Sequence, residues 1–153
     1  MEGCGDFWAA LSTEYGLAHE DTVVVNVEAL PNSYSDHCGL NVEVWDTVVS
    51  DTQTLENIYT EVRRKVDRYI GEEVRTVNVV FQCKWEKHRS VAITEITTAL
   101  FHRDDRIVEP ATHLSKTNWG EWKCGRKDCP RHEWNQRKND VMARAQTIFD
   151  EVF

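Results

Sequence analysis

The sequence lacks any apolar run of about 18 residues, the length that a membrane-spanning helix requires. Its first residues, MEGCGDFW, contain neither the basic stretch nor the apolar stretch of a secretory signal. Asn-x-Ser/Thr glycosylation sites are absent as well. These absences predict a cytoplasmic protein that makes no contact with membranes.

The common catalytic motifs are also missing. The chain has no glycine-rich phosphate loop, no His-Glu-x-x-His and no Gly-x-Ser-x-Gly. The tripeptide His102-Arg103-Asp104 matches part of the protein-kinase catalytic loop, but the other kinase motifs do not accompany it. The sequence therefore favours a protein without catalytic activity.

The five cysteines are an odd number and are spread unevenly, which favours reduced thiols over a disulfide framework. Charge is uneven too. Residues 113–138 contain seven basic and three acidic residues, a formal charge of +4, so the rest of the chain carries −12. Such asymmetry predicts an oriented partner or, alternatively, only a soluble surface. At 153 residues the chain fits a single domain, 1–153, that includes this irregular basic segment.

Hydrophobic periodicity predicts three helices and four or five strands. The apolar positions from 53 to 70 follow one helical stripe, with Ser50 and Gln53 as a capping box and Gly71 as a C-cap. Alternating or β-branched stretches predict the strands. The predicted helices span 6–15, 53–70 and 134–152, and the predicted strands span 22–29, 40–45, 74–85, 90–101 and 106–108.

This order of elements predicts an α+β fold. A mainly antiparallel sheet of four to five strands, built from hairpins, would be covered by two or three helices. Cys83 falls on the apolar side of its strand, so it is expected to be a buried hydrophobe.

The segment 113–138 brings together residues that bind zinc. Cys124, Cys129 and His132 lie within nine residues, and His113 is the nearest candidate for a fourth ligand. A metal could order a segment that has few aliphatic residues. The spacing matches no standard zinc finger or zinc knuckle, so free thiols in a surface loop or a local disulfide stay open as alternatives.

The same segment interleaves tryptophans with cations. Such a pattern suits single-stranded nucleic acid, because bases stack on the rings while phosphates contact the cations. It equally suits a protein interface, or tryptophans that pack inward beneath solvated cations. The residues predicted to bind a partner are Lys116, Trp119, Trp122, Lys123, Arg126, Lys127 and Arg131.

Two resemblances suggest other functions. Gln82-Cys83-Lys84, downstream of Glu43 and Asp46, resembles the acidic and lysine element of restriction-like nucleases, which implies a metal-dependent nuclease. The order of helices and hairpins is similar to that of small phage tail-terminator and minor tail proteins, which implies a homo-oligomeric assembly protein.

The sequence thus predicts a non-catalytic binding module. Its basic, tryptophan-rich and zinc-ordered segment would engage nucleic acid or a nucleic-acid-associated protein. The nuclease and the assembly protein remain as alternatives.

Overall fold

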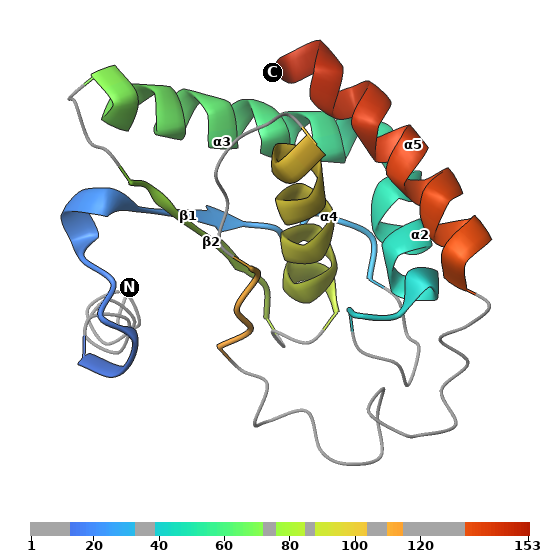
Figure 1. Cartoon of the computed structure of the whole chain (residues 1–153), viewed down its shortest axis with the longest axis horizontal. Coiled ribbons are helices and arrows are strands. Elements are labelled where there is room, and N and C mark those ends of the chain that lie inside the picture. The colour runs from blue at the N-terminus through green and yellow to red at the C-terminus, as the bar shows by residue number, and fades with distance from the viewer. Residues whose placement is uncertain (1–12, 33–38, 72–75, 85–87, 104–109, 115–133) are drawn as a thin grey trace.

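A computed structural model gives the fold of the protein. The residue ranges that it describes are 13–32, 39–71, 76–84, 88–103, 110–114 and 134–153. Figure 1 labels the helices and strands of these ranges. In chain order they are the 3-10 helix η1 (His19–Asp21), β1 (Thr22–Asn26), α2 (Val42–Ser50), α3 (Thr52–Gly71), β2 (Asn78–Gln82), α4 (Arg89–Arg103) and α5 (Trp134–Val152).

The protein is a mainly helical α/β fold with a small parallel sheet. Within the described residues the sheet consists of β1 and β2, which run parallel with Thr22 opposite Asn78 and Asn26 opposite Gln82. Parallel neighbours need a crossover connection, and α2 and α3 lie on that connection. The predicted α+β fold with a mainly antiparallel sheet of four to five strands is therefore wrong.

Two predicted strands are helices. Of residues 40–45, the last four form the start of α2, and Asn41 caps the helix by accepting a hydrogen bond from the Glu43 amide at 2.9 Å. Residues 90–101 form most of α4, so the hairpins that these strands would have made do not exist. The threonines of α4 satisfy their hydroxyls inside the helix, because Thr94 donates to the Ser90 carbonyl at 2.6 Å and Thr98 donates to the Thr94 carbonyl at 2.7 Å.

The strands predicted at 22–29 and 74–85 correspond to the shorter β1 and β2. Val24 and Thr22, on the outer edge of β1, use their carbonyls to bind α3. The Val24 carbonyl accepts a hydrogen bond from Lys65 Nζ at 2.9 Å, and the Thr22 carbonyl accepts one from the Tyr69 hydroxyl at 3.5 Å. Side chains of α3 thus cover an edge that would otherwise be open to another strand.

The long central helix is confirmed, although its cap differs from the prediction. α3 begins at Thr52, and the Asp51 carboxylate accepts hydrogen bonds from the Thr54 hydroxyl at 2.7 Å and the Thr54 amide at 3.1 Å. Ser50 belongs to α2 and donates to the Thr47 carbonyl, so the predicted Ser50–Gln53 capping box is wrong. The two hydrogen bonds from Thr54 hold the pKa of Asp51 below its usual value, and the bond from the hydroxyl has the larger effect.

The last helix, α5, is confirmed with its predicted bounds. Its predicted apolar face is buried from Val141 to Phe149 and packs on α2, α3 and α4. Polar contacts also hold α5 on α2, since the Asp46 carboxylate pairs with Arg144 and with Arg137 at 3.6 Å. Lys138 Nζ lies 5.1 Å from the centre of the Trp45 ring, within the range of a cation–π contact.

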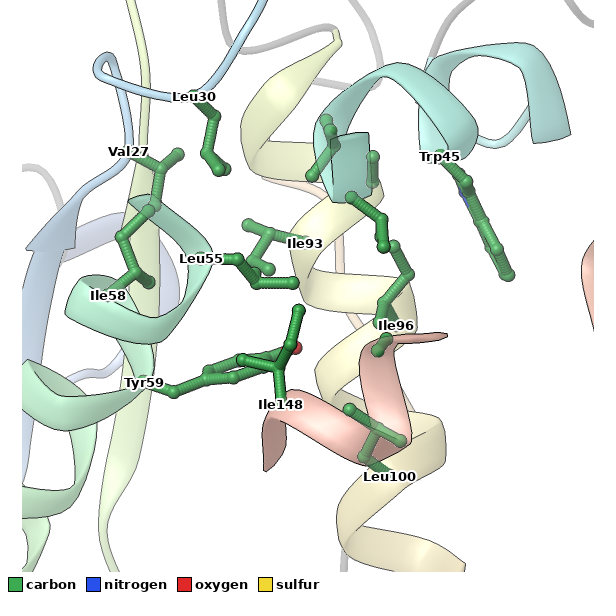
Figure 2. Close-up of a cluster of buried hydrophobic side chains, with 14 of the residues drawn as sticks. Val27, Leu30, Trp45, Leu55, Ile58, Tyr59, Ile93, Ile96, Leu100 and Ile148 are labelled. Atoms are coloured by element: carbon green, nitrogen blue, oxygen red, sulfur yellow. The ribbon is translucent and has the colours of Figure 1, made fainter. Parts of the chain in front are cut away.

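The helices and one face of the sheet enclose a single apolar core. Figure 2 shows side chains of α3, α4 and α5 meeting there, among them Leu55, Ile93 and Ile148. Tyr59 is buried in this core, and its hydroxyl accepts a hydrogen bond from the buried Thr97 at 3.2 Å. Burial raises the pKa of Tyr59 far above its usual value, because ionisation would place a charge among apolar groups.

Two further predictions fall partly or wholly outside the described residues. Of the predicted helix 6–15, residues 13–15 are helical, and Gly16 then adopts a φ of 65°, the left-handed conformation that often ends a helix. The predicted strand 106–108 lies outside the described residues. Among the helices that are described, none is long and apolar enough to cross a membrane.

Candidate functional site

The candidate site lies where the two strands end. Because β1 and β2 are parallel, their carboxyl ends meet at one edge of the sheet. α4 follows β2 and begins at Arg89, so its amino end is beside the same edge. In open α/β folds, ligands bind at this edge, and anions bind at helix amino ends, where free N–H groups and the helix dipole favour negative charge.

A thiol and a hydroxyl fix the junction between β2 and α4. Cys83 directly follows β2, and its Sγ accepts a hydrogen bond from the Ser90 amide at 3.4 Å. The Cys83 thiol lies 3.2 Å from the Ser90 hydroxyl and donates to it. Both residues are buried, Cys83 being 4% exposed and Ser90 5% exposed. The prediction that Cys83 is buried is confirmed, and its polar contact with Ser90 holds the first turn of α4 against the end of β2.

An arginine joins the same turn to the end of β1. Arg89 Nη1 donates hydrogen bonds to the main-chain carbonyl of Glu28 and, at 3.5 Å, to that of Leu30. Asn26 shapes this turn from the other side, because its side-chain oxygen accepts a hydrogen bond from the Glu28 amide at 2.8 Å. The turn that follows β1 is therefore bonded to the first residue of α4.

A glycine brings the loop before α2 into contact with α4. A Cβ atom at Gly39 would lie 2.3 Å from the His88 carbonyl oxygen and 2.6 Å from the Ala92 amide nitrogen. Only a residue without a side chain fits this approach. The Gly39 carbonyl in turn accepts a hydrogen bond from Trp45 Nε1 at 2.6 Å, which links the loop to α2.

The charges at this end of the molecule are mixed, since helix amino ends and Lys84 share it with Glu28 in the turn after β1 and Glu43 in the first turn of α2. Figure 1 shows the amino ends of α2, α4 and α5 at the lower end of the view, toward which β2 also runs. Each helix places the positive end of its dipole there. Lys84, directly after Cys83, is exposed and adds a positive charge beside the amino end of α4.

Most of the residues that the sequence predicted for a site lie outside the described residues. These are Lys116, Trp119, Trp122, Lys123, Cys124, Arg126, Lys127, Cys129, Arg131 and His132. Their roles in zinc or partner binding stay predictions. His113, the proposed fourth zinc ligand, is described, and its Nε2 lies 2.6 Å from the Glu95 carboxylate on α4. Within the described part of the chain, no group of three potential metal ligands is found.

The residues of the two resemblances are placed differently from what those families require. Glu43 and Asp46 lie on helix α2, and Asp46 is paired with Arg137 and Arg144, so these acids do not flank Lys84 from a neighbouring strand. The hairpin order shared with tail proteins is replaced by helices.

Sequence reasoning missed the residues that build the junction. Gly39, Asn41, Arg89 and Ser90 were assigned to a loop or to strands. One signal could have found Ser90: an apolar strand that is followed directly by a cysteine and, seven residues later, by a serine at the start of a helix. That signal is visible only if residues 90–101 are recognised as a helix.

Comparison with known proteins identifies relatives in Mycobacteroides abscessus and Streptomyces griseus. A nucleotide-binding protein of Mycobacteroides abscessus is 31% identical over 108 residues, which cover 65% of this chain and 36% of the relative. A nucleotide-binding protein of Streptomyces griseus is 34% identical over 109 residues, which cover 60% of this chain and 33% of the relative. The chain thus spans about a third of the length of the curated relatives that it matches.

No solved structure matches the chain. The sequence profile of the RapZ C-terminal domain matches residues 9–114, a range that runs from before β1 to beyond α4 and leaves α5 outside it. Because this match covers more than half of the sequence, the chain belongs to the RapZ C-terminal domain family.

Proposed function

We propose that the chain is a non-catalytic binding module for a phosphate-bearing ligand of the nucleic-acid class. A phosphate would be held at the amino end of α4, beside the carboxyl ends of β1 and β2. The observation that carries the proposal is the junction itself, in which Cys83, Arg89 and Gly39 fix the first turn of α4 from three directions.

The physical support is preorganisation. The first N–H groups of a helix have no partners within the helix, and a phosphate at its end gains hydrogen bonds together with the dipole. In α4 the Ser90 amide already donates to Cys83 Sγ, so the phosphate would bond to the other amides of the first turn. Here the first turn is already bonded to its surroundings, so little conformational entropy would be lost when a ligand binds. Lys84 would contribute the charge that neutralises the phosphate.

The relatives support the same class of ligand. Proteins of Mycobacteroides abscessus and Streptomyces griseus that share this region carry the name nucleotide-binding protein. Since the shared region is about a third of each relative, their binding activity comes to this chain only as part of the proposal.

The basic segment 113–138 would extend the site along a polymer. Its cations and tryptophans suit phosphates and unstacked bases, which a single nucleotide would not fully use. The segment starts beside α4, because His113 contacts Glu95 and the Leu114 carbonyl accepts a hydrogen bond from the Tyr15 hydroxyl at 3.2 Å. A single-stranded nucleic acid is therefore the ligand that we propose, with zinc as an ordering element of the segment.

The nuclease and assembly hypotheses gain no support from the described residues, since Asp46 is engaged by arginines and the hairpins are absent. Formation of a homo-oligomer remains a separate prediction, which native mass spectrometry would check.

The proposal is tested by fluorescence anisotropy with a labelled single-stranded oligoribonucleotide at several salt concentrations. Binding should weaken steeply with salt, and Lys84→Gln should reduce the slope of log K against log salt by about 0.7. Arg64→Gln, the same charge change on an exposed position of α3, is the matched control and should leave both values unchanged. If the unmodified protein does not bind at low salt, the proposed function is refuted.

A further inference from the structure

We infer that Arg137 and Arg144 of α5 form an arginine fork that binds a phosphate of the nucleic acid, and that Asp46 of α2 is an internal competitor for this fork. The inference rests on the proposed function, because Arg137 belongs to the basic segment 113–138 and the ligand is the same single-stranded nucleic acid. It adds Arg144, which lies beyond that segment, and it does not depend on the amino end of α4.

The two arginines converge on one carboxylate. Arg137 and Arg144 are seven residues apart, so they lie two turns apart on the same side of α5, which packs on α2 (Figure 1). Arg137 Nη2 lies 3.6 Å from Asp46 Oδ2, and Arg144 Nη2 contacts Oδ1, the other oxygen of the same group. Two guanidinium groups that meet around one anion can also meet around a phosphate, whose oxygens accept the paired hydrogen bonds that arginine donates.

The arginine fork is open to solvent. The exposed fractions of the side chains are 52% for Arg137, 47% for Arg144 and 43% for Asp46. Ion pairs this exposed contribute little to stability, because water screens both charges. A phosphodiester carries one negative charge, as the Asp46 carboxylate does, so it could replace the carboxylate at small cost.

A lysine and two further acids lie on the same two helices. Lys138, the last cation of the basic segment, is held with its Nζ 5.1 Å from the centre of the buried Trp45 ring, next to Asp46 in the sequence. Glu43 on α2 and Asp140 on α5 are exposed acids. The surface therefore has little net charge, and its contact with a polymer would come from the short-range hydrogen bonds of the arginine fork.

The role of Asp46 separates this inference from simple docking of α5 on α2. If the ion pairs only hold α5 in place, Asp46→Asn loosens α5 and leaves binding unchanged or weaker. If Asp46 competes with the phosphate, the same change frees both arginines and strengthens binding. The gain should be roughly two- to sixfold, the range expected when an exposed ion pair no longer competes with the ligand.

Fluorescence anisotropy with the labelled oligoribonucleotide, over a range of salt, tests the inference in the full chain. Asp46→Asn should bind more tightly at low salt, whereas Arg144→Gln should bind more weakly and reduce the slope of log K against log salt by about 0.7. Asp67→Asn is the matched control, because it makes the same charge change and also frees an arginine, Arg63, from a carboxylate, but on α3. Its affinity should equal that of the unmodified protein.

Arg137→Gln should have the same two effects as Arg144→Gln, and it keeps the test valid if Arg144→Gln does not fold. An affinity of Asp46→Asn that is unchanged or weaker would overturn the inference, and so would an unchanged salt slope in the arginine variants. Equal strengthening by Asp67→Asn would also overturn it, because net charge alone would then explain the gain. Absence of binding in the unmodified protein would instead refute the proposed function.

Discussion

Replacing Gly39 by alanine tests the close packing at the junction most simply. The added Cβ would meet the His88 carbonyl oxygen at 2.3 Å, the Ala92 amide nitrogen at 2.6 Å and the Val91 Cβ at 2.6 Å. Two of these atoms are backbone atoms, one in the residue before α4 and one in its first turn, so no side-chain rotation can relieve the contact. The loop and the helix would have to separate by roughly 1 Å to restore van der Waals distances.

Overpacking of this kind costs typically 1–3 kcal/mol, and a clash with backbone belongs in the upper part of that range, about 2–3 kcal/mol. For a domain of this size the melting temperature would then fall by about 4–12 °C. Urea unfolding followed by circular dichroism at 222 nm would give the free energy of unfolding, with an unchanged m-value if the native state keeps its compactness.

Two other glycines are matched controls for Gly39→Ala. A Cβ atom at Gly71, the last residue of α3, meets nothing within 4 Å, so Gly71→Ala should be neutral or stabilise the protein by up to about 1 kcal/mol. Gly16 also has open space but a φ of +65°, so alanine there should cost about 1 kcal/mol through backbone strain alone. If Gly39→Ala were as well tolerated as Gly71→Ala, the close approach of the loop to α4 would be refuted.

Four further predictions follow from single contacts. Asn41→Ala removes the cap of α2 and should lower the free energy of unfolding by about 1 kcal/mol, and an unchanged urea midpoint would contradict the capping role. The Asp51 carboxyl has a lower pKa in the folded protein than the value of 3.8 that it has in the unfolded chain, so its ionised form stabilises the fold above pH 3.8. This contribution is lost as pH falls through the folded pKa. The difference in the free energy of unfolding between the intact protein and Asp51→Asn should therefore shrink below pH 3.8. Tyr59→Phe removes the acceptor of the buried Thr97 hydroxyl and should destabilise by about 1–2 kcal/mol, whereas the double variant with Thr97→Val should recover part of the loss in a double-mutant cycle. Elemental analysis of the purified protein should find one zinc per chain if Cys124, Cys129, His132 and His113 form a site, and a value near zero would reject it.

The sequence predicted the elements that have one clear periodicity. The stripe along α3 and the apolar face of α5 each repeat at helical spacing beside a polar face, and their bounds were found to within a residue or two. β1 was recognised because Val23, Val25 and Val27 alternate with less buried positions.

The sequence failed where a helix is short or buried around much of its circumference. In α4 the consecutive residues from Ser90 to Ile93 are all buried, as are Ile96 and Thr97, so the buried positions do not form the narrow apolar stripe that marks a helical period. Its valine, isoleucine and threonine residues also favour strands when they are considered locally. Tertiary packing overrides that preference, and the hydroxyls of Thr94 and Thr98 find acceptors within the helix.

The candidate site could not be predicted because it depends on this error. The parallel pairing of β1 with β2 and the helix after Cys83 together create the edge at which Arg89 and Ser90 act. Neither residue belongs to a sequence motif with an established role, and the close approach of Gly39 to α4 spans about fifty residues of chain. The basic segment was recognisable from its composition alone, and its role stays a prediction.

The central claim is that a phosphate-bearing ligand binds at the amino end of α4. Nuclear magnetic resonance with ¹⁵N-labelled protein tests it most directly, through amide shifts during titration with a single-stranded oligoribonucleotide. We expect the largest shifts at residues 88–92 and at Gly39 and Lys84, with small shifts on α3. Shifts confined to α3 and the carboxyl half of α5, or no shifts at all at low salt, would contradict it.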